Sequence, residues 1–205
     1  AKSLTQDFLD ALCGEFQPEV VMENITIPKW KEYVGGRMTQ PLIDKLLAAV
    51  EQAKSSKGRG AAARLQAGTK LMNDTKAALA ELKQYLSTED LQYQMIADKI
   101  GLEVLQCGID YYNDSEEPDA AFKAKVLQEY AQSIVVGQMA TNRCKENVEV
   151  LMEIIAKLPP TEVLAEGKAI REELRKYCDL PEEIDNAITL LKNTKPYLKA
   201  IKKKL

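Results

Sequence analysis

Proline is nearly absent from the middle of this 205-residue sequence. Between Pro41 and Pro159 the chain contains a single proline, Pro118. A proline inside a helix removes a backbone hydrogen bond and clashes with the preceding turn, so a segment without proline can form a long helix. Pro118 itself falls between two segments in which apolar residues recur every three or four positions, the spacing of a helix face. The sequence therefore predicts an all-α protein in which long antiparallel helical hairpins form a bundle or a stacked helical array.

Residues 41–158 are predicted to form this long-helix bundle. Thr39-Gln40-Pro41 resembles a helix start, because a hydroxyl can cap the first turn and proline is tolerated inside it. The first helix is expected to end in the loop of serines and glycines around Gly58. Helical spacing then continues over 61–86 and 91–112. Beyond Pro118 it runs to Leu158, which predicts a single helix over 120–158 with any bend at Gly137.

Residues 1–40 are predicted to be an irregular N-terminal segment with one short helix over 3–13. Pro18, Pro28 and the pair Gly35-Gly36 interrupt the helical spacing. Between them, the runs Val20-Val21-Met22 and Ile25-Thr26-Ile27 are typical of extended chain. We expect this segment to lie over the helices.

Pro159-Pro160 marks the end of the bundle pattern. Residues 159–205 are predicted to form a C-terminal subdomain of shorter helices packed on the bundle. Three helices are expected, over 161–177, 181–191 and 196–204, since Pro181 and Pro196 each stand where a new helix can begin.

The composition permits a sizeable core, with 45% hydrophobic residues, 29% charged residues and a net charge of −3. No apolar run approaches the roughly 18–20 residues of a membrane span, and the first residues lack the features of a signal peptide. The four cysteines are too far apart for a C-x-x-C site and are expected to be reduced and buried. A cytoplasmic location is therefore predicted. Because the sequence begins at Ala1, a domain cut from a longer protein remains an open alternative.

Histidine is absent, which removes the commonest general base and the commonest nitrogen ligand for zinc. The Glu-x-x-His motif of di-iron bundles cannot occur without it. The carboxylates around Pro118 lack the glycine-containing pattern of calcium loops, and ordinary turn solvation explains them. The sequence therefore predicts no enzymatic activity, no metal site and no cofactor.

Two basic segments are candidate anion-binding sites. The loop before the second long helix combines flexible glycines with cations, a composition that can hold a phosphate at a helix start, and its candidates are Lys54, Lys57, Arg59 and Arg64. The C-terminal segment forms a basic face with no acidic residue after Asp185, and its candidates are Lys192, Lys195, Lys199, Lys202 and Lys203. For each segment the alternative is that its cations contact only solvent. The first segment would then be a mobile loop, and the second a helix end whose positive charge the helix dipole favours.

Trp30, Tyr33 and Arg37 have the composition of a contact hot spot, because aromatic residues and arginine dominate binding energy at protein interfaces. The same residues could instead attach the N-terminal segment to the bundle. Both interpretations stay open on the sequence.

The sequence favours a non-enzymatic helical interaction domain, an adaptor or regulatory part that binds another protein. Two alternatives remain: an anion- or nucleic-acid-binding role for the basic segments, and a small apolar ligand held between the long helices near Gly101, Gly108 and Gly137. Salt dependence separates the first alternative from protein binding, since phosphate contacts weaken steeply with salt. A homo-oligomer is also compatible with the helical spacing, because a second copy can cover an apolar helix face.

Overall fold

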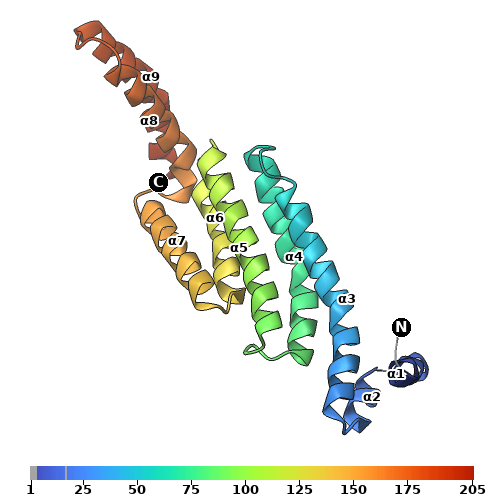
Figure 1. The fold of residues 1–205 in the computed structure, drawn as a ribbon. Coiled ribbons are helices and arrows are strands. Elements are labelled where there is room, and N and C mark those ends of the chain that lie inside the picture. Colours follow the sequence, from blue (N-terminus) through green and yellow to red (C-terminus); the bar gives the residue numbers. More distant parts are fainter. Residues whose placement is uncertain (1–3, 17) are drawn as a thin grey trace.

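The computed structural model describes residues 4–16 and 18–205, and every regular element in these ranges is helical. Figure 1 shows the elements in chain order. They are α1 (Leu4–Glu15), α2 (Pro18–Asn24), α3 (Pro28–Lys54), α4 (Ala61–Tyr85), α5 (Leu91–Asp114), α6 (Ala120–Ile134), α7 (Gln138–Ala156), the 3-10 turn η1 (Thr161–Val163), α8 (Leu164–Cys178) and α9 (Ile184–Lys204).

Helices α3 to α7 stand side by side in the order of the chain (Figure 1). Each of these helices packs against the next one, and contacts also join α3 to α5, α4 to α6, and α5 to α7. Helices α1 and α2 lie at one end of this array, whereas α8 and α9 form a hairpin at the other end. The predicted all-α array of long helices is confirmed.

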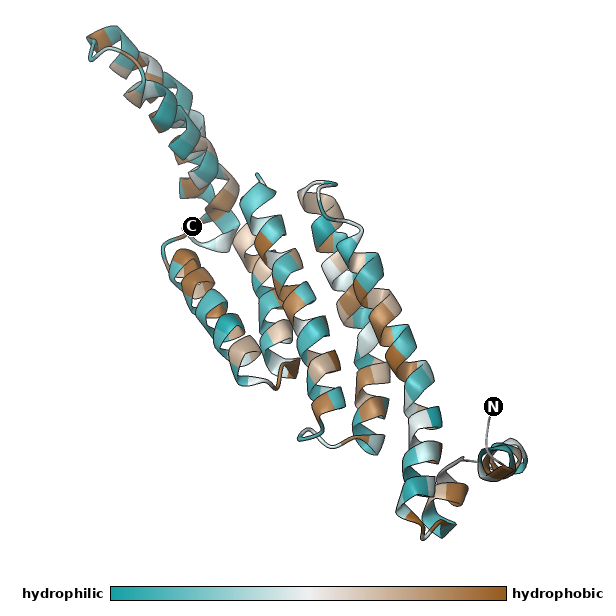
Figure 2. Cartoon of the chain, viewed as in Figure 1, coloured by the Kyte–Doolittle hydropathy of each residue, from teal (hydrophilic) through white to brown (hydrophobic). Residues whose placement is uncertain are grey.

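The core of the array forms where apolar positions of neighbouring helices meet. Figure 2 shows apolar residues recurring along each helix with hydrophilic residues between them, the pattern of amphipathic packing. Helix α5 occupies the centre and contributes the largest buried set, which is Tyr93, Ile96, Ala97, Ile100, Gly101, Val104, Leu105, Cys107, Gly108 and Tyr111.

Glycines allow the central helices to approach closely. A Cβ atom on Gly101 would lie 2.4 Å from Val135 Cγ1, and one on Gly108 would lie 3.3 Å from the carbonyl oxygen of Ala124. A Cβ atom on Gly137 would lie 2.3 Å from a carboxylate oxygen of Asp98. The space beside these three glycines, where one of the alternative interpretations placed a small apolar ligand, is thus filled by the protein itself.

The N-terminal forty residues are more helical than the sequence suggested. The predicted short first helix is present as α1. Residues 20–22, which were predicted to be extended, form part of α2, whereas 25–27 lie outside the helices. Helix α3 begins at Pro28 and continues through Gly35, Gly36 and Pro41. The predicted helix start at 39–41 was wrong, because the Thr39 hydroxyl does not cap a helix; it donates to the carbonyl oxygen of Gly35 within α3.

The predicted single helix over 120–158 is divided into α6 and α7 at Val135, Val136 and Gly137. A carboxylate from the neighbouring helix α5 explains the break. Asp98 Oδ1 accepts hydrogen bonds from the backbone N–H groups of Val136, at 2.8 Å, and Gly137, at 3.1 Å. Such a carboxylate satisfies free N–H groups at a helix start and favours the positive end of its dipole. The chain therefore turns back here and forms an α6–α7 hairpin.

The C-terminal segment contains two helices after η1 rather than three. The segments predicted at 181–191 and 196–204 merge into α9, which passes through Pro196 without ending. Since proline lacks a backbone N–H, this continuation forgoes one helical hydrogen bond. The α8–α9 hairpin projects beyond the array rather than lying along it (Figure 1), and Lys168 Nζ of α8 donates to the carbonyl oxygen of Glu116 where the hairpin leaves the array.

Candidate binding groove at the amino-terminal end

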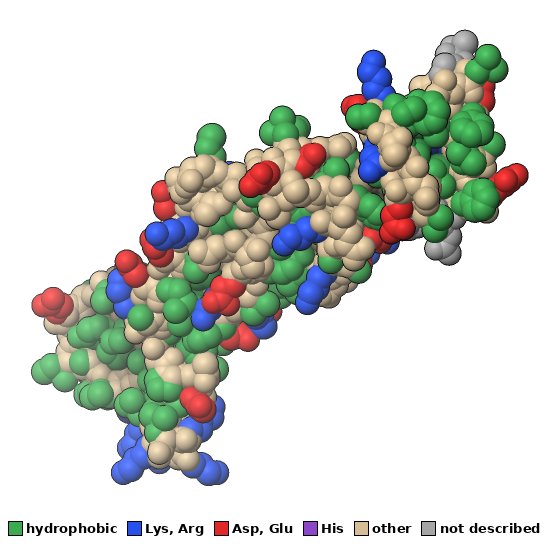
Figure 3. Space-filling model, turned by 90° about the horizontal axis from the view of Figure 1, so that it is seen from below, with side chains coloured by type: hydrophobic (Ala, Val, Ile, Leu, Met, Phe, Trp, Pro, Cys, Tyr) green, Lys and Arg blue, Asp and Glu red, His purple; other side chains and the backbone are tan. Residues whose placement is uncertain are grey.

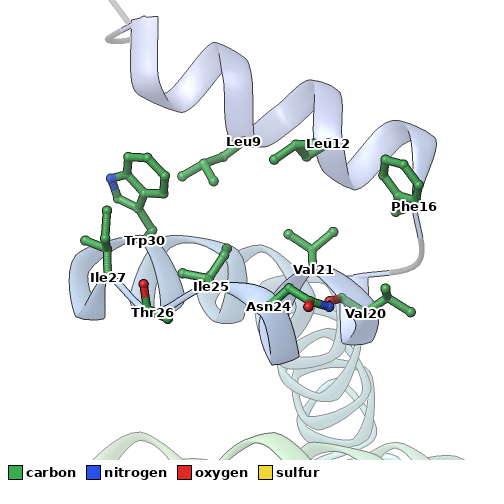
Figure 4. A pocket seen from close by; sticks show the side chains of 10 residues that line it. All are labelled: Leu9, Leu12, Phe16, Val20, Val21, Asn24, Ile25, Thr26, Ile27 and Trp30. Atoms are coloured by element: carbon green, nitrogen blue, oxygen red, sulfur yellow. The ribbon is translucent and has the colours of Figure 1, made fainter.

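An apolar groove lies between α1 on one side and α2 with the start of α3 on the other. Its volume is about 380 Å³. Figure 4 shows the lining side chains between the two layers, and these are Leu9, Leu12, Phe16, Val20, Val21, Asn24, Ile25, Thr26, Ile27 and Trp30. The groove belongs to the segment that the sequence analysis treated as irregular.

Helix α1 is attached to α3 by a small set of contacts. Leu9 is buried in an apolar cluster with Val34. The Tyr33 hydroxyl donates to Asp10 Oδ1 at 2.8 Å, and the Arg37 guanidinium pairs with the same oxygen. These contacts hold α1 above α2 and leave the apolar space between them open.

The groove is chemically simple. None of its ten lining residues carries a charge, and the side chains of Asn24 and Thr26 are its polar contribution. Phe16, Val20 and Ile27 remain 54%, 48% and 43% exposed, although all three are large and apolar. Fully burying an exposed side chain of this size is worth about 1.5–3 kcal/mol, so covering the exposed half of each contributes about 1 kcal/mol. The groove is therefore suited to an apolar partner surface rather than to a charged ligand.

The predicted hot-spot residues have different environments in the structure. Tyr33 and Arg37 contact Asp10 of α1, which is the attachment role that the sequence left open. Trp30 lines the groove, and its ring centre lies 6.5 Å from that of Phe8 at 60°. A binding role for Trp30 stays a prediction.

Sequence reasoning missed the groove residues contributed by α1 and α2. The signals were present, since apolar residues recur on one side of 4–12, an apolar run follows at 20–22, and Ile25 and Ile27 come shortly after it. They were interpreted as a short helix and extended chain, which do not by themselves indicate a groove. The hollow arises only because α1 folds back over α2 and α3.

A second hollow, of about 510 Å³, lies where the tip of the α5–α6 hairpin meets α8. Its lining combines both signs of charge, with Glu116, Glu117, Lys168, Arg171, Glu172 and Arg175. Opposite charges so close together neutralise one another, so this hollow favours neither an anion nor a cation. The N-terminal groove is the better candidate site.

The predicted anion-binding loop loses one of its four cations to the interior. Lys54 Nζ donates to Glu51 Oε1 at 2.8 Å, whereas Lys57 and Arg59 are exposed in the loop. Arg64 points into the protein, where its side chain is 2% exposed. It is not available to an external anion, so the four cations do not form one site.

The Arg64 guanidinium is held by a polar network between α3, α4 and α5. Its Nε donates to Asp110 Oδ2 at 2.8 Å, and both terminal nitrogens donate to Glu103 Oε1 at 3.1 Å. The carbonyl oxygen of Ala53 and the hydroxyl of Ser56 also accept from it, each at 3.1 Å. Because two carboxylates neutralise one buried cation, the network joins three helices rather than forming a binding site.

The predicted basic face lies along α9. Lys204 is engaged within the hairpin, since its Nζ lies 2.7 Å from Glu166 Oε1 and donates to the carbonyl oxygen of Glu162. The five predicted lysines are all exposed, namely Lys192, Lys195, Lys199, Lys202 and Lys203. Unlike the loop cations, they form one continuous basic side.

The four cysteines are free thiols in three environments: Cys107 and Cys144 are buried, Cys13 is partly buried and Cys178 is exposed. The expectation that all are buried was wrong for Cys178, which ends α8. Burial, opposed by the nearby Arg64, raises the pKa of the Cys107 thiol to about 12. Burial also raises the pKa of Cys144.

Thiol labelling is expected to follow this order. Since the thiolate is the reactive form, iodoacetamide at pH 8 should modify Cys178 first and leave Cys107 and Cys144 unmodified in the folded protein. Peptide mass spectrometry over a time course measures the rates, with a urea-unfolded sample as the control in which all four react. Modification of Cys107 as fast as Cys178 in the folded protein would contradict the packing around α5.

No protein-family model matches this chain, and searches of curated proteins and of solved structures returned no match. Among residues 4–16 and 18–205, no helix is both long and apolar enough to cross a membrane. In the same ranges, no group of three or more cysteine, aspartate or glutamate side chains is arranged to hold a metal ion. Functional inference therefore depends on the geometry of the surface.

Proposed function

We propose that this chain is a non-enzymatic helical interaction domain, of the adaptor or regulatory type, that binds another protein through the N-terminal groove. The observation that supports the proposal most directly is the groove itself, an uncharged hollow in which the large apolar side chains of Phe16, Val20 and Ile27 stay about half exposed. Exposed apolar surface of this kind is costly in water and typically marks an interaction site. The partner chemistry that fits is the apolar face of an amphipathic helix, which anchors in such grooves by side chains three or four residues apart.

The array supports the same proposal. Helices α3 to α7 form a continuous packed body, to which the groove is attached through α3. A rigid support lowers the entropy cost of binding, because fewer groups must be ordered when the partner arrives.

A substitution at Ile27 tests the groove without threatening the fold. Ile27 occupies the N-cap position of α3 and makes no side-chain cap hydrogen bond. Ile27→Asp places a charge in the groove and at the same time introduces a residue preferred at N-caps. We expect this variant to keep wild-type stability in urea unfolding and to lose partner affinity by about 30-fold, the size of a hot-spot effect of about 2 kcal/mol.

The binding experiment is a pull-down from nuclease-treated and untreated lysate at moderate salt, read by mass spectrometry for the wild type, Ile27→Asp and a control. Val150→Glu is the control, since Val150 is an exposed apolar residue on α7. We expect a protein recovered by the wild type and by Val150→Glu but not by Ile27→Asp, with its affinity then measured on purified components. Recovery that depends on nucleic acid, or that is unchanged by Ile27→Asp, would contradict the proposal and favour the basic segments.

A further inference from the structure

Helix α9 and the Leu205 that caps its C-terminal end carry a stripe of large aliphatic side chains with no cover in the described protein. Ile184, Leu191, Leu198 and Leu205 are spaced by seven residues and are 80%, 66%, 54% and 75% exposed. Seven residues are nearly two helical turns, and the drift is about 20° per heptad, so the four side chains lie along one side of the helix. We call these four residues the α9 stripe.

The contacts of α9 leave the stripe free. Among the described elements, α9 packs against α8 and η1. Its buried residue is Thr194, and the Asn193 side chain donates to Glu173 of α8 at 2.8 Å. Thr194 lies three positions from Leu191 and four from Leu198, so the stripe flanks the face of α9 that contacts α8. The exposed fractions of the stripe side chains show that this contact does not cover them. Figure 3 shows hydrophobic side chains gathered at this end of the molecule, with a group of Lys and Arg side chains beside them.

The spacing of the stripe is self-complementary in the antiparallel sense. Its four positions are symmetric about the midpoint between Thr194 and Lys195. An antiparallel second copy of α9 therefore places Leu191 opposite the copy's Leu198, and Ile184 opposite the copy's Leu205. A seven-residue repeat is the spacing by which two helices cover one another along their whole length.

The charges select the antiparallel orientation. Carboxylates surround the start of the stripe, at Glu182, Glu183 and Asp185, whereas Lys199, Lys202 and Lys203 surround its end. An antiparallel copy brings the carboxylates of one chain near the lysines of the other, but a parallel copy places like charges together. An anionic membrane lying on the stripe would meet the carboxylates at one end, and the single narrow stripe lacks the wide apolar face of interfacial helices.

We propose that the α9 stripe is the interface of a homodimer in which the two α9 helices pack antiparallel about a twofold axis. The interface is isologous, so it closes after two copies and leaves the N-terminal groove of each copy open. This proposal concerns a different surface from the groove and does not depend on it.

Sedimentation velocity of the full chain, from micromolar to sub-millimolar concentration, tests the dimer. We expect a dimer for the wild type. Leu191→Glu should weaken association by at least about 100-fold, because each dimer loses two buried leucines and gains two charges at its centre. Met139→Glu on α7, where Met139 is 88% exposed, is the matched control and should remain dimeric. Leu191 is also exposed, so its substitution should leave the unfolding curve of the monomer unchanged.

Disulfide trapping tests the orientation in a Cys178→Ser background. Lys195 stands beside the proposed axis, so Lys195→Cys should give a covalent dimer on mild oxidation, whereas Leu205→Cys at the end of the stripe should not. A monomer at every concentration, a dimer that persists in Leu191→Glu, or cross-linking through position 205 rather than 195 would each overturn the proposal. Ile27→Asp should remain dimeric, so that failure of the groove and failure of the dimer are separate results.

Discussion

Arg64→Met is expected to lower the free energy of unfolding by about 3 kcal/mol, the largest loss that we predict for a single residue. The substitution leaves Glu103 and Asp110 without the cation that they share, in an environment where their side chains are 11% and 20% exposed. Breaking a buried ion pair costs about 3–5 kcal/mol, and we expect the lower end because water still reaches both carboxylates. Urea unfolding followed by circular dichroism measures the change.

Two further variants separate charge from packing at Arg64. Arg143→Met removes an exposed arginine of α7 whose guanidinium donates to Gln106 Oε1 at 3.0 Å, and it should change stability by no more than about 0.5 kcal/mol. Arg64→Met combined with Glu103→Gln and Asp110→Asn removes both unpaired charges and should recover much of the loss. If Arg64→Met were as mild as Arg143→Met, the network would not be what joins the three helices.

Much of the helical array could be predicted from the sequence because its signals are local. The spacing of apolar residues and the absence of proline predicted the long helices, and the Ser- and Gly-rich loop correctly separated α3 from α4. The errors arose where a distant group decides the outcome. Asp98 accepts hydrogen bonds at the start of α7 from 38 residues away. Gly137 indicated where a bend could fall, but nothing between Pro118 and Leu158 indicated that the helix would end there.

Turn and cap signals also led to wrong predictions of helix starts, one near each end of the chain. Thr39 and Pro41 have the chemistry of a helix start, yet they lie inside α3, and Pro196 lies inside α9. Both prolines are exposed on their helices. A proline costs a helix one hydrogen bond and local strain, which an otherwise continuous helix can bear when its remaining turns pack well. Helix propensity alone therefore could not predict that α3 and α9 continue through their prolines.

The candidate sites were predictable only in part. The basic residues of α9 were found because charge and exposure go together on a helix surface. Arg64 was grouped with its sequence neighbours, whereas the structure directs it inward to carboxylates 39 and 46 residues away. The N-terminal groove was missed because it is a relation between α1 and α2, which no single segment displays.

Gly68→Ala is expected to destabilise the protein by about 1–3 kcal/mol, although alanine is the better helix former. A Cβ atom at position 68 of α4 would lie 2.7 Å from Cys107 Cβ and 2.8 Å from Leu127 Cδ1. The first of these atoms is fixed by the backbone of α5, so the two helices must move apart, and this cost exceeds the gain in helix propensity of about 1 kcal/mol.

Gly36→Ala provides the opposite case, since Gly36 lies inside α3 with no atom within 4 Å of an added Cβ. That variant should gain up to about 1 kcal/mol, because propensity acts there without a clash. Urea unfolding of the two variants should therefore show shifts of opposite sign, and a stabilising Gly68→Ala would mean that α4 and α5 do not approach as closely as their glycine allows.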